Sequence, residues 1–367
     1  MRILFVANPN SPHTRRWVNW FARHGHTVFV AADNPLKDPW PEVTVFDLPR
    51  FFNLPGLRWL VWALCLRVLI RRWKPDILHA HRVSAAGWLA AASGFHPQVV
   101  TPWGSDLYVH PLRSTLAAWL ARFCLRRADL VTADSKDLLL AAQRYGAAPA
   151  RCALVQWGVD ARVFRPAPAS QVDRAAYQIS GSPVIFSPRA CKPLYNLDQI
   201  VAAFPAVRAR YPQAQLILRA FEPDPAYRAA LEVQVERLGL ADAMRWIGQI
   251  EPWEKIAALF QLSDLAVSVP SSDGTPGSVL EAMACGVPVI ASDLPSLREW
   301  ITPGENGLLF DSNDPRSIAE SVIAALENKN LRDKAAGLNQ EIISARAEYG
   351  QNMSKAEEFY RSVTGRQ

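Results

Sequence analysis

Short apolar runs alternate with segments of helical periodicity along most of the chain. In the first 165 residues the apolar runs are about five residues long, and each is followed by a segment with helical spacing of apolar side chains. Strands of this length that alternate with helices are typical of βαβ units and a parallel sheet. The pattern predicts strands at Ile3–Ala7, Thr27–Ala31, Asp76–Ala80, Gln98–Thr101, Leu130–Ala133 and Ala153–Val155, and helices near residues 12–24, 57–73, 84–93, 112–127 and 135–145.

The alternation stops once and then restarts. Arg165–Ser170 is rich in Pro, Ala and Ser, which is typical of a linker. We expect a first domain over residues 1–165, a linker over 166–182, a second domain over 183–348 and a C-terminal helix over 349–367 that packs on one of the domains, the first being the candidate. In the second domain the pattern predicts strands at Val184–Ser187, Gln215–Arg219, Met244–Ile247, Leu265–Val269, Val287–Ala291 and Leu308–Phe310, and helices near 194–209, 225–238, 253–262, 278–285 and 314–327.

The predicted fold class is therefore α/β, with two Rossmann-like, doubly wound domains in tandem that face a cleft. No short repeat period occurs, which argues against a solenoid. Doubly wound sheets bind their ligands at the carboxyl ends of the strands, so the loops that follow the strands should hold the functional residues.

Composition narrows the class of protein. Half of the residues are apolar and 20% are charged, which is ordinary for a globular chain and excludes a disordered protein or a coiled coil. The five cysteines are odd in number and form no C-x-x-C motif, so we expect buried free thiols in a reducing cytosol. No signal peptide is evident, and the most apolar stretch, Leu57–Ile70, contains two arginines and is too short to span a bilayer. We expect a cytoplasmic protein, at most peripheral at the inner face of the membrane.

Charge is distributed unevenly. Residues 1–165 contain 21 Lys and Arg against 10 Asp and Glu, a net charge of +11, whereas the remainder contains 19 against 24, a net charge of −5. A basic half favours an anionic partner such as a membrane surface. No nucleic-acid recognition module is evident, so nucleic acid is not an expected partner. The apolar segment Leu57–Trp73 is either a buried helix with a basic rim or an interfacial element near anionic lipid. A second basic helix contributes Arg113, Arg122, Arg126 and Arg127.

The most informative segment is Ser271–Ser292. It predicts a glycine-rich loop after a strand, then a short helix that ends at Gly286, then a second strand. Backbone N–H groups at the start of such a helix form an anion site. The pattern places Glu281 in the first helical turn, where the helix dipole stabilises a carboxylate by about 0.3–1 kcal/mol. A carboxylate in this position suits the hydroxyl pair of a sugar.

This segment resembles the acidic-x7-acidic signature of family 4 glycosyltransferases, which have the GT-B fold and retain anomeric configuration. The second half of the segment, from Leu280 to Val289, matches the family signature closely, whereas Asp273 stands where the family has Glu. The resemblance implies that Glu281 holds the ribose of a nucleotide sugar and that Asp273 lies near the transferred sugar. Asp273 could instead simply cap the helix. The implied donor-binding residues are Gly274, Thr275, Pro276, Gly277, Ser278, Val279, Leu280 and Glu281.

Other stretches extend the resemblance. After the first strand of the second domain the family has an Arg and, five residues later, a Lys, and both grip the diphosphate. Arg189 matches, but position 194 is Leu, so the nearby Lys192 is the candidate cation and could equally be a solvated loop charge. Arg suits bidentate phosphate contact, whereas Lys acts as a point charge. The implied catalytic residues are Arg189, Lys192 and Asp273.

The first domain contains two further family-like strands. Lys74–His81 resembles the family's Pro-Asp-x-x-His-x-His strand, and Val100–Asp106 resembles its Thr-x-His-Gly-x-Asp motif with Trp103 in place of His. Trp103 could stack on a sugar ring or pack in the core. His79 and His81 could form a metal pair, but no third ligand lies at useful spacing, so a core or cleft role is expected. The predicted acceptor or sugar pocket comprises Ser11, His13, His79, His81, Trp103 and Asp106.

The resemblance implies a retaining glycosyltransferase that moves a sugar from a nucleotide-diphospho-sugar to a glycan, lipid-linked or small-molecule acceptor in polysaccharide or glycoconjugate biosynthesis. No Asp-x-Asp motif is present to clamp a metal on the diphosphate, so we expect no metal and no cofactor. The absence of G-x-G-x-x-G, P-loop and G-x-S-x-G motifs argues against a dehydrogenase, a P-loop NTPase and an α/β-hydrolase. The alternatives are a non-hydrolysing sugar-nucleotide 2-epimerase and a non-catalytic nucleotide-sugar-binding protein.

Overall fold

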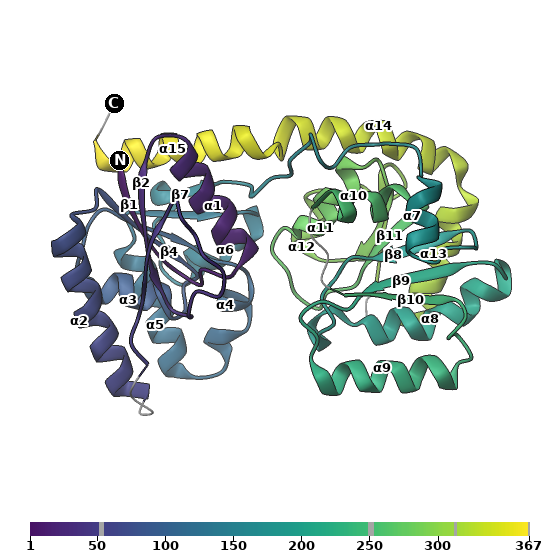
Figure 1. Ribbon diagram of the computed structural model, residues 1–367, viewed down its shortest axis with the longest axis horizontal. Coiled ribbons are helices and arrows are strands. Elements are labelled where there is room, and N and C mark those ends of the chain that lie inside the picture. The colour runs from purple at the N-terminus through teal and green to yellow at the C-terminus, as the bar shows by residue number, and fades with distance from the viewer. Residues whose placement is uncertain (51–54, 249–252, 312–313, 366–367) are drawn as a thin grey trace. The chain divides into compact units, whose positions relative to one another are not determined.

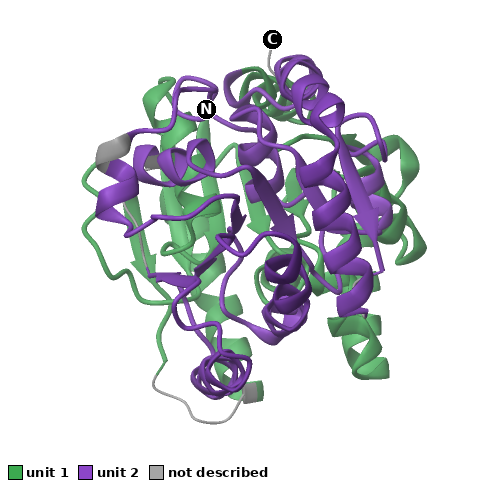
Figure 2. Cartoon of the chain, turned by 90° about the vertical axis from the view of Figure 1, so that its right-hand side faces the viewer, with its two compact units in different colours: residues 1–157, 351–367 green, residues 158–350 purple. Residues whose placement is uncertain are grey.

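The computed structural model describes residues 1–50, 55–248, 253–311 and 314–365. The chain divides into two compact units, coloured separately in Figure 2. Unit 1 comprises residues 1–157 and 351–367, and unit 2 comprises residues 158–350. Each unit is built on a parallel sheet flanked by helices (Figure 1). The predicted fold class, two doubly wound α/β domains, is confirmed.

The described part of unit 1 contains a seven-stranded parallel sheet with the order β3-β2-β1-β4-β5-β6-β7. Its strands are nearly free of charged residues because both faces are covered by helices. The strands are β1 (Arg2–Ala7), β2 (Thr27–Ala32), β3 (Thr44–Asp47), β4 (Ile77–His81), β5 (Gln98–Thr101), β6 (Leu130–Ala133) and β7 (Cys152–Leu154).

Helices cover the two faces of this sheet unequally. One face packs its apolar side chains against α2, α3, α5 and α6. The other face packs against α1 and α15, where Phe5 contacts Phe21 and Trp17 contacts His79. The helices are α1 (Pro12–Arg23), α2 (Pro55–Trp73), α3 (Ala86–Ser93), α4 (Ser105–Tyr108), α5 (Thr115–Arg127), α6 (Lys136–Arg144) and α15 (Tyr349–Thr364), with 3-10 turns at His110–Leu112 and Pro149–Arg151.

The described part of unit 2 contains a six-stranded parallel sheet with the order β10-β9-β8-β11-β12-β13. The strands are β8 (Val184–Ser187), β9 (Gln215–Arg219), β10 (Met244–Ile247), β11 (Leu265–Ser268), β12 (Val289–Ser292) and β13 (Gly307–Phe310). Helices α10, α11 and α14 cover one face, and α8, α9 and α13 cover the other. The helices are α7 (Gln171–Ala176), α8 (Leu197–Arg210), α9 (Pro225–Arg237), α10 (Trp253–Gln261), α11 (Gly277–Ala284), α12 (Pro295–Arg298), α13 (Pro315–Glu327) and α14 (Lys329–Arg346), with a 3-10 turn at Pro193–Tyr195.

Local sequence signals explain where many of these helices begin and end. The side chains of Ser114, Ser135 and Asp224 accept hydrogen bonds from the first turns of α5, α6 and α9. Gly286 has φ of +75° just after α11, a backbone conformation that glycine adopts without steric cost. The predicted helix stop at Gly286 is therefore confirmed.

The predicted division of the chain differs from the observed one. The boundary between the units lies after Trp157, and the whole of the expected linker, 166–182, belongs to unit 2. That stretch also contains α7, whose first turn is capped by Ser170. A Pro-rich composition indicates where regular structure is interrupted, but it does not show on which sheet the segment packs.

Residues 351–367 belong to unit 1 although the preceding chain belongs to unit 2. The fully buried Tyr360 of α15 stacks on Phe21 and its hydroxyl hydrogen-bonds His79 Nδ1. Glu357 also lies 3.1 Å from His26 Nε2. The last helix is therefore part of the unit 1 core.

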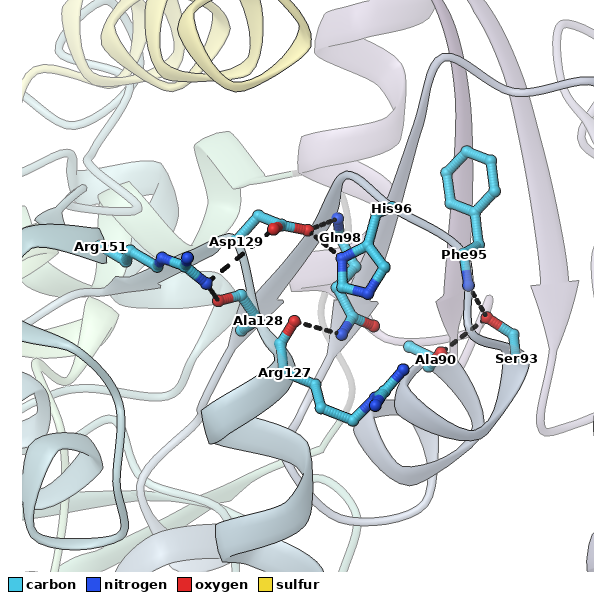
Figure 3. A network of polar contacts seen from close by, with 9 residues as sticks. All are labelled: Ala90, Ser93, Phe95, His96, Gln98, Arg127, Ala128, Asp129 and Arg151. Carbon is cyan, nitrogen blue, oxygen red and sulfur yellow. Dashed lines mark hydrogen bonds and ion pairs between the residues drawn. The ribbon is translucent and has the colours of Figure 1, made fainter.

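A network of polar contacts lies at the amino-terminal edge of the unit 1 sheet (Figure 3). The Asp129 carboxylate contacts His96 Nδ1 at 2.6 Å and accepts the Gln98 backbone N–H at 2.8 Å, and Arg151 lies 4.0 Å away. The Gln98 side chain donates to the Arg127 carbonyl oxygen. This network joins the starts of β5, β6 and β7, at the edge opposite to the one where ligands bind in such sheets.

Two expectations from the sequence concern the thiols of the cysteines and the length of apolar helices. All five cysteines are unpaired, and Cys124, Cys191 and Cys285 are buried while Cys65 and Cys152 are half-buried. The expectation of buried free thiols is therefore correct for three of them. Across the described segments, no helix is both long enough and apolar enough to span a bilayer.

Candidate functional site

In unit 2 the order of strands reverses between β8 and β11, so the loops after these strands diverge to opposite faces of the sheet. Ligands of doubly wound sheets bind at such a point. Arg189 follows β8, and Asp273 and Ser278 follow β11. The structure therefore brings together residues that the sequence analysis selected from two distant motifs.

Arg189 is the centre of this cluster. Its side chain is 8% exposed, and its guanidinium forms an ion pair with Asp273. A second guanidinium nitrogen donates a hydrogen bond of 3.1 Å to Ser278 Oγ, and the guanidinium carbon lies 4.2 Å from the ring centre of Tyr195. Three neighbours thus fix the position of this cation.

Hydrogen bonds join the two loops that hold Arg189 and Asp273. Asn196 Nδ2 donates to the Val269 carbonyl oxygen at 2.9 Å and to Ser271 Oγ at 2.8 Å. The Ser271 backbone N–H in turn donates to the Leu194 carbonyl oxygen. Asn196 has φ of +45°, a left-handed conformation that Asn tolerates better than most residues. Asn196 therefore acts as the clamp between the loops, a role that its position in the sequence does not reveal.

Burial dominates the electrostatics of Asp273. Burial raises the pKa of its carboxyl group, while the Arg189 charge and the Gly274 backbone N–H oppose this rise. The Asp273 backbone carbonyl also accepts a hydrogen bond from Ser296 Oγ. These contacts hold Asp273 against Arg189, and its side chain does not cap α11 in the structure, because Pro276 occupies the N-cap position.

The predicted donor-binding segment is buried except at Gly277 and Ser278, which are half-buried. Val279 and Leu280 are 1% and 2% exposed and belong to the apolar core, so their side chains serve packing. Thr275 Oγ1 accepts a hydrogen bond from the Trp300 indole, and Ser278 Oγ accepts one from Arg189. The remaining member of the predicted segment is Pro276 at the N-cap of α11.

Glu281 differs from its predicted place. It is the fifth residue of α11 and therefore lies in the second turn, not the first, because the helix begins at Gly277. It is 8% exposed. A buried carboxylate needs compensation, and the nearby charge that the sequence analysis missed is Arg219.

Arg219 is the last residue of β9, the strand that pairs with β8. It is 8% exposed, and its Nε–H has no hydrogen-bond partner among the described residues. Burial lowers its pKa, the Glu281 carboxylate opposes this effect, and the Phe221 ring lies 4.0 Å from the guanidinium carbon. The sequence signal for this residue is an arginine at the carboxyl end of a strand, after three apolar residues.

Lys192 lies on the same loop as Arg189 but is more exposed. Its ammonium group pairs with Glu222 at 2.6 Å, and both side chains are largely open to solvent. Glu222 follows β9 in a left-handed conformation with φ of +42°. Lys192 is thus held at the same edge of the sheet by a weak surface pair.

In unit 1 some candidate residues lie in the buried core, and others lie at the carboxyl edge of the sheet. His79 is fully buried, and both its ring nitrogens are occupied, one by Thr101 Oγ1 at 2.6 Å and the other by the Tyr360 hydroxyl. Burial lowers its pKa well below the ordinary value, so the ring is neutral. His79 therefore joins α15 to the sheet, and the structure gives it no free nitrogen for an acceptor.

Asp106 and His81 are also buried, 2% exposed each. Asp106 accepts the backbone N–H groups of Val83 at 2.6 Å and Trp103 at 2.8 Å, so it fixes the loop that presents Trp103. His81 Nδ1 contacts Thr14 Oγ1, and its Nε2 has no partner in the part of the chain that the structure describes. Burial, with help from His13 and Arg82, lowers the pKa of His81 to about 3.

A cluster of aromatic rings lies at the carboxyl edge of the unit 1 sheet. His13 follows β1, Trp103 follows β5, and Trp157 follows β7. The His13 and Trp157 ring centres are 4.3 Å apart, and Trp103 lies within 5.7 Å of both. The indole N–H groups of Trp103 and Trp157 are buried without a partner among the described residues. Trp157 is not among the candidate residues selected from the sequence.

Ser11 is the N-cap residue of α1, although its hydroxyl makes no capping hydrogen bond. It lies half-buried two residues before His13. Over the described ranges, no group of three or more His, Cys, Asp or Glu side chains is placed to hold a metal ion.

Comparison with protein families gives two adjacent matches. The model described as "Glycosyl transferase 4-like" matches residues 2–135, and the model described as "Glycosyl transferases group 1" matches residues 170–339. The first match lies in unit 1 and the second in unit 2. Both halves of the chain are thus matched by glycosyltransferase models.

Individual relatives agree with these matches. A D-inositol 3-phosphate glycosyltransferase of Thermobispora bispora is 30% identical over 236 residues, which are 62% of this chain and 53% of the relative. A phosphatidyl-myo-inositol mannosyltransferase of Mycobacterium tuberculosis is 31% identical over 182 residues, 48% of this chain and 45% of the relative. The chain spans about half the length of the curated relatives it matches.

Solved structures show the same fold over the full length. Anabaena HepE in complex with UDP and glucose has a TM-score of 0.81 at 20% identity and covers 99% of this chain and 100% of its own. Sucrose-phosphate synthase of Thermosynechococcus elongatus has a TM-score of 0.83 at 18% identity, with coverage of 100% and 99%. The solved structures show the GT-B fold, and the two family matches show that the chain belongs to the family 4 glycosyltransferases.

Proposed function

We propose that this protein is a retaining glycosyltransferase in which unit 2 binds a nucleoside-diphosphate sugar. The observation that carries the proposal is the cluster of Arg189, Asp273 and Ser278 at the point where the order of strands reverses, beside the start of α11. A buried, oriented guanidinium suits a diphosphate. The structures of HepE with UDP and with UDP-glucose, which share this fold, support a nucleotide sugar as the donor.

Each group in unit 2 has a role in donor binding under this proposal. Arg189 and the backbone N–H groups of Gly274, Thr275, Gly277 and Ser278 contact the diphosphate, with Lys192 as a more distant cation at the same edge. Glu281 accepts hydrogen bonds from the ribose hydroxyls. Arg219, which lies near Glu281, donates its unpartnered Nε–H to an oxygen of the nucleotide and so offsets the cost of its burial.

The proposed transfer exchanges one bond of the anomeric carbon for another and moves one proton. The bond between the anomeric carbon and the leaving diphosphate oxygen breaks, and a bond from the acceptor oxygen to the same carbon forms on the same face. The proton of the acceptor hydroxyl passes to the leaving phosphate. Arg189 and the loop N–H groups stabilise the negative charge that develops on the diphosphate, so no carboxylate nucleophile and no metal are required.

Unit 1 supplies the acceptor site in this proposal. The His13, Trp103 and Trp157 rings provide apolar faces for a sugar ring, and the indole N–H groups and His81 Nε2 provide hydrogen bonds for its hydroxyls. Ser11 lies two residues before His13, and Asp106 positions Trp103. This combination favours a glycan, lipid-linked or small polyhydroxyl acceptor in glycoconjugate biosynthesis, at the inner face of a membrane.

The experiment that tests this function measures donor binding and then transfer. Calorimetry with UDP-, GDP-, ADP- and TDP-sugars should show saturable binding of one donor class, and an acceptor panel should then yield a product with retained configuration. Treatment with EDTA should leave transfer intact. Conversion of the donor without any acceptor would indicate the 2-epimerase instead, which the glycosyltransferase names of the relatives do not favour. Binding with no turnover on any acceptor would indicate a binding protein.

A further inference from the structure

Unit 1 exposes an unusual number of large apolar side chains on two helices. On α2, Leu57, Leu60, Leu64 and Val68 are 41–59% exposed. Their spacing of three or four residues places them on one side of the helix. A second group lies on and before α5 and comprises Leu112, Leu116 and Trp119, which are 57–77% exposed. Isolated exposed apolar residues are normal on protein surfaces, but an ordered stripe is not.

The two groups belong to the same layer of unit 1. Helix α3 packs against both α2 and α5, and the inner sides of all three helices contribute to one core cluster against the sheet. Trp62, Leu66 and Leu69 point into that core from α2, so the exposed stripe is the opposite side of the same helix. Figure 1 shows α2, α3 and α5 together in unit 1. We call the exposed side of α2 and α5 the apolar–basic face.

Charge on these helices has a single sign. Helices α2, α3 and α5 contain seven arginines and no Asp or Glu. Arg67, Arg71 and Arg72 are exposed toward the end of α2, and Arg122 and Arg126 are exposed on α5. Each group of exposed apolar side chains therefore lies beside exposed guanidinium groups.

We propose that the apolar–basic face docks unit 1 on the surface of an anionic lipid bilayer. Leucine and tryptophan side chains enter the boundary between headgroups and acyl chains, while the arginines remain at the level of the lipid phosphates. A second copy of this chain is a poorer occupant, because two such faces would bring their arginines together without a carboxylate between them. The proposal deepens the membrane part of the proposed function, but it does not depend on nucleotide binding.

The apolar–basic face suits contact with the surface of a membrane and not passage through the bilayer. In the described residues no helix meets the requirements of a bilayer span, and the stripe covers only one side of α2. The lipid contact thus requires both apolar insertion and electrostatic attraction. Loss of the apolar side chains and loss of the arginines should therefore each weaken binding to vesicles.

The test is co-sedimentation of the full chain with vesicles of phosphatidylglycerol and phosphatidylcholine, compared with vesicles of phosphatidylcholine alone. Binding should require the anionic lipid and weaken at high ionic strength. The variant Leu60→Ser/Leu64→Ser/Val68→Ser should lower the partition coefficient roughly tenfold or more. The variant Arg71→Gln/Arg72→Gln should lower it by about fivefold for each cation removed.

Matched controls use exposed apolar residues outside the face. Leu140→Ser on α6 and Val233→Ser on α9, at sites 52% and 65% exposed, should leave vesicle binding unchanged. Absence of binding by the wild type, or equal binding by the α2 triple variant, would overturn the proposal. So would a concentration-dependent dimer in gel filtration that the triple variant abolishes, since the occupant would then be a second copy. Calorimetric titration of the same variants with UDP measures donor binding separately. It therefore distinguishes failure of the membrane proposal from failure of the proposed donor site.

Discussion

Arg189 and Asp273 are 84 residues apart in the sequence, and their side chains form an ion pair at the carboxyl edge of the unit 2 sheet. The pair joins the loop after β8 to the loop after β11. It also means that the carboxylate occupies N–H groups of the guanidinium that the proposed diphosphate would use. Under the proposed function the donor must compete with Asp273 for Arg189, and the two residues should respond differently to substitution.

Replacement of Arg189 by Ala should reduce turnover by roughly 10²-fold or more, the scale of losing one preformed electrostatic stabiliser. The measurement is the rate of sugar transfer at saturating donor. Arg245→Ala is a matched control, because Arg245 lies in the same unit and donates to the backbone oxygens of Gln178 and Asp242. Turnover close to that of the wild type in the Arg189 variant would remove this residue from the site.

Replacement of Asp273 by Asn should tighten the binding of UDP while it lowers the rate of transfer. The amide no longer repels the phosphates or neutralises Arg189, so the affinity should rise by roughly tenfold, equivalent to about 1.4 kcal/mol. Loss of the buried pair should also lower the melting temperature of the protein without nucleotide. Calorimetry and thermal unfolding, each with and without UDP, measure both effects. An unchanged or weaker affinity for UDP would contradict the competition.

Replacement of Glu281 by Ala should mainly weaken binding of the nucleotide. Hydrogen bonds to a charged group contribute about 1.5–3 kcal/mol, which corresponds to roughly a 10- to 150-fold rise in Kd. Calorimetric titration with UDP measures this, and Glu320→Ala on the exposed part of α13 serves as the control. If Kd is the same in the Glu281 variant as in the wild type, the ribose role is wrong.

Replacement of Arg219 by Met keeps the apolar volume of the side chain but removes the guanidinium. We expect Kd for UDP to rise by about tenfold or more, since a buried charged donor loses its ligand contact. Titrations with UDP, GDP and pyrophosphate show which part of the nucleotide Arg219 meets. A loss common to all three points to phosphate, and a loss confined to UDP points to the base. No change with any of them would show that Arg219 is structural only.

The buried histidines predict an acid-dependent loss of stability. His81 has a pKa of about 3 in the folded chain against an ordinary value near 6.5, so below pH 6.5 the unfolded chain binds a proton that the folded chain does not. The free energy of unfolding should therefore fall with decreasing pH, by about 1.4 kcal/mol per pH unit for this residue, between pH 6.5 and about 3. Urea titrations at several pH values give the free energy of unfolding at each pH. The slope of this free energy against pH should be smaller in His81→Gln than in the wild type. Equal slopes in the variant and the wild type would contradict the lowered pKa.

The strands were predictable because their signal is local. Val184–Ser187, Gln215–Arg219 and Met244–Ile247 coincide with the observed strands, since each is a short segment in which three of the residues are large and apolar. Strand β3 escaped prediction because its four residues are mostly exposed and form no apolar run. Helix α14 escaped because only a few of its residues are buried.

The site was predictable only in part. Arg189, Asp273 and Glu281 stand in motifs, so the sequence indicated them through resemblance. Arg219, Asn196 and Trp157 stand in no motif, and their importance depends on what lies next to them in space. His79 shows the opposite case, since its motif suggested a pocket but its two nitrogens are bonded to Thr101 and Tyr360.

The sequence by itself determined the class of fold, the order of most of the strands and helices along the chain, and the loops that hold the charged residues. Those properties follow from hydrophobic periodicity and turn chemistry, which act over a few neighbouring residues. Only the tertiary structure decided that Asp273 neutralises Arg189, that Arg219 lies near Glu281, and that the last helix belongs to the first unit. The physical reason is that burial and electrostatic pairing depend on contacts between segments far apart in the chain, which local patterns do not specify.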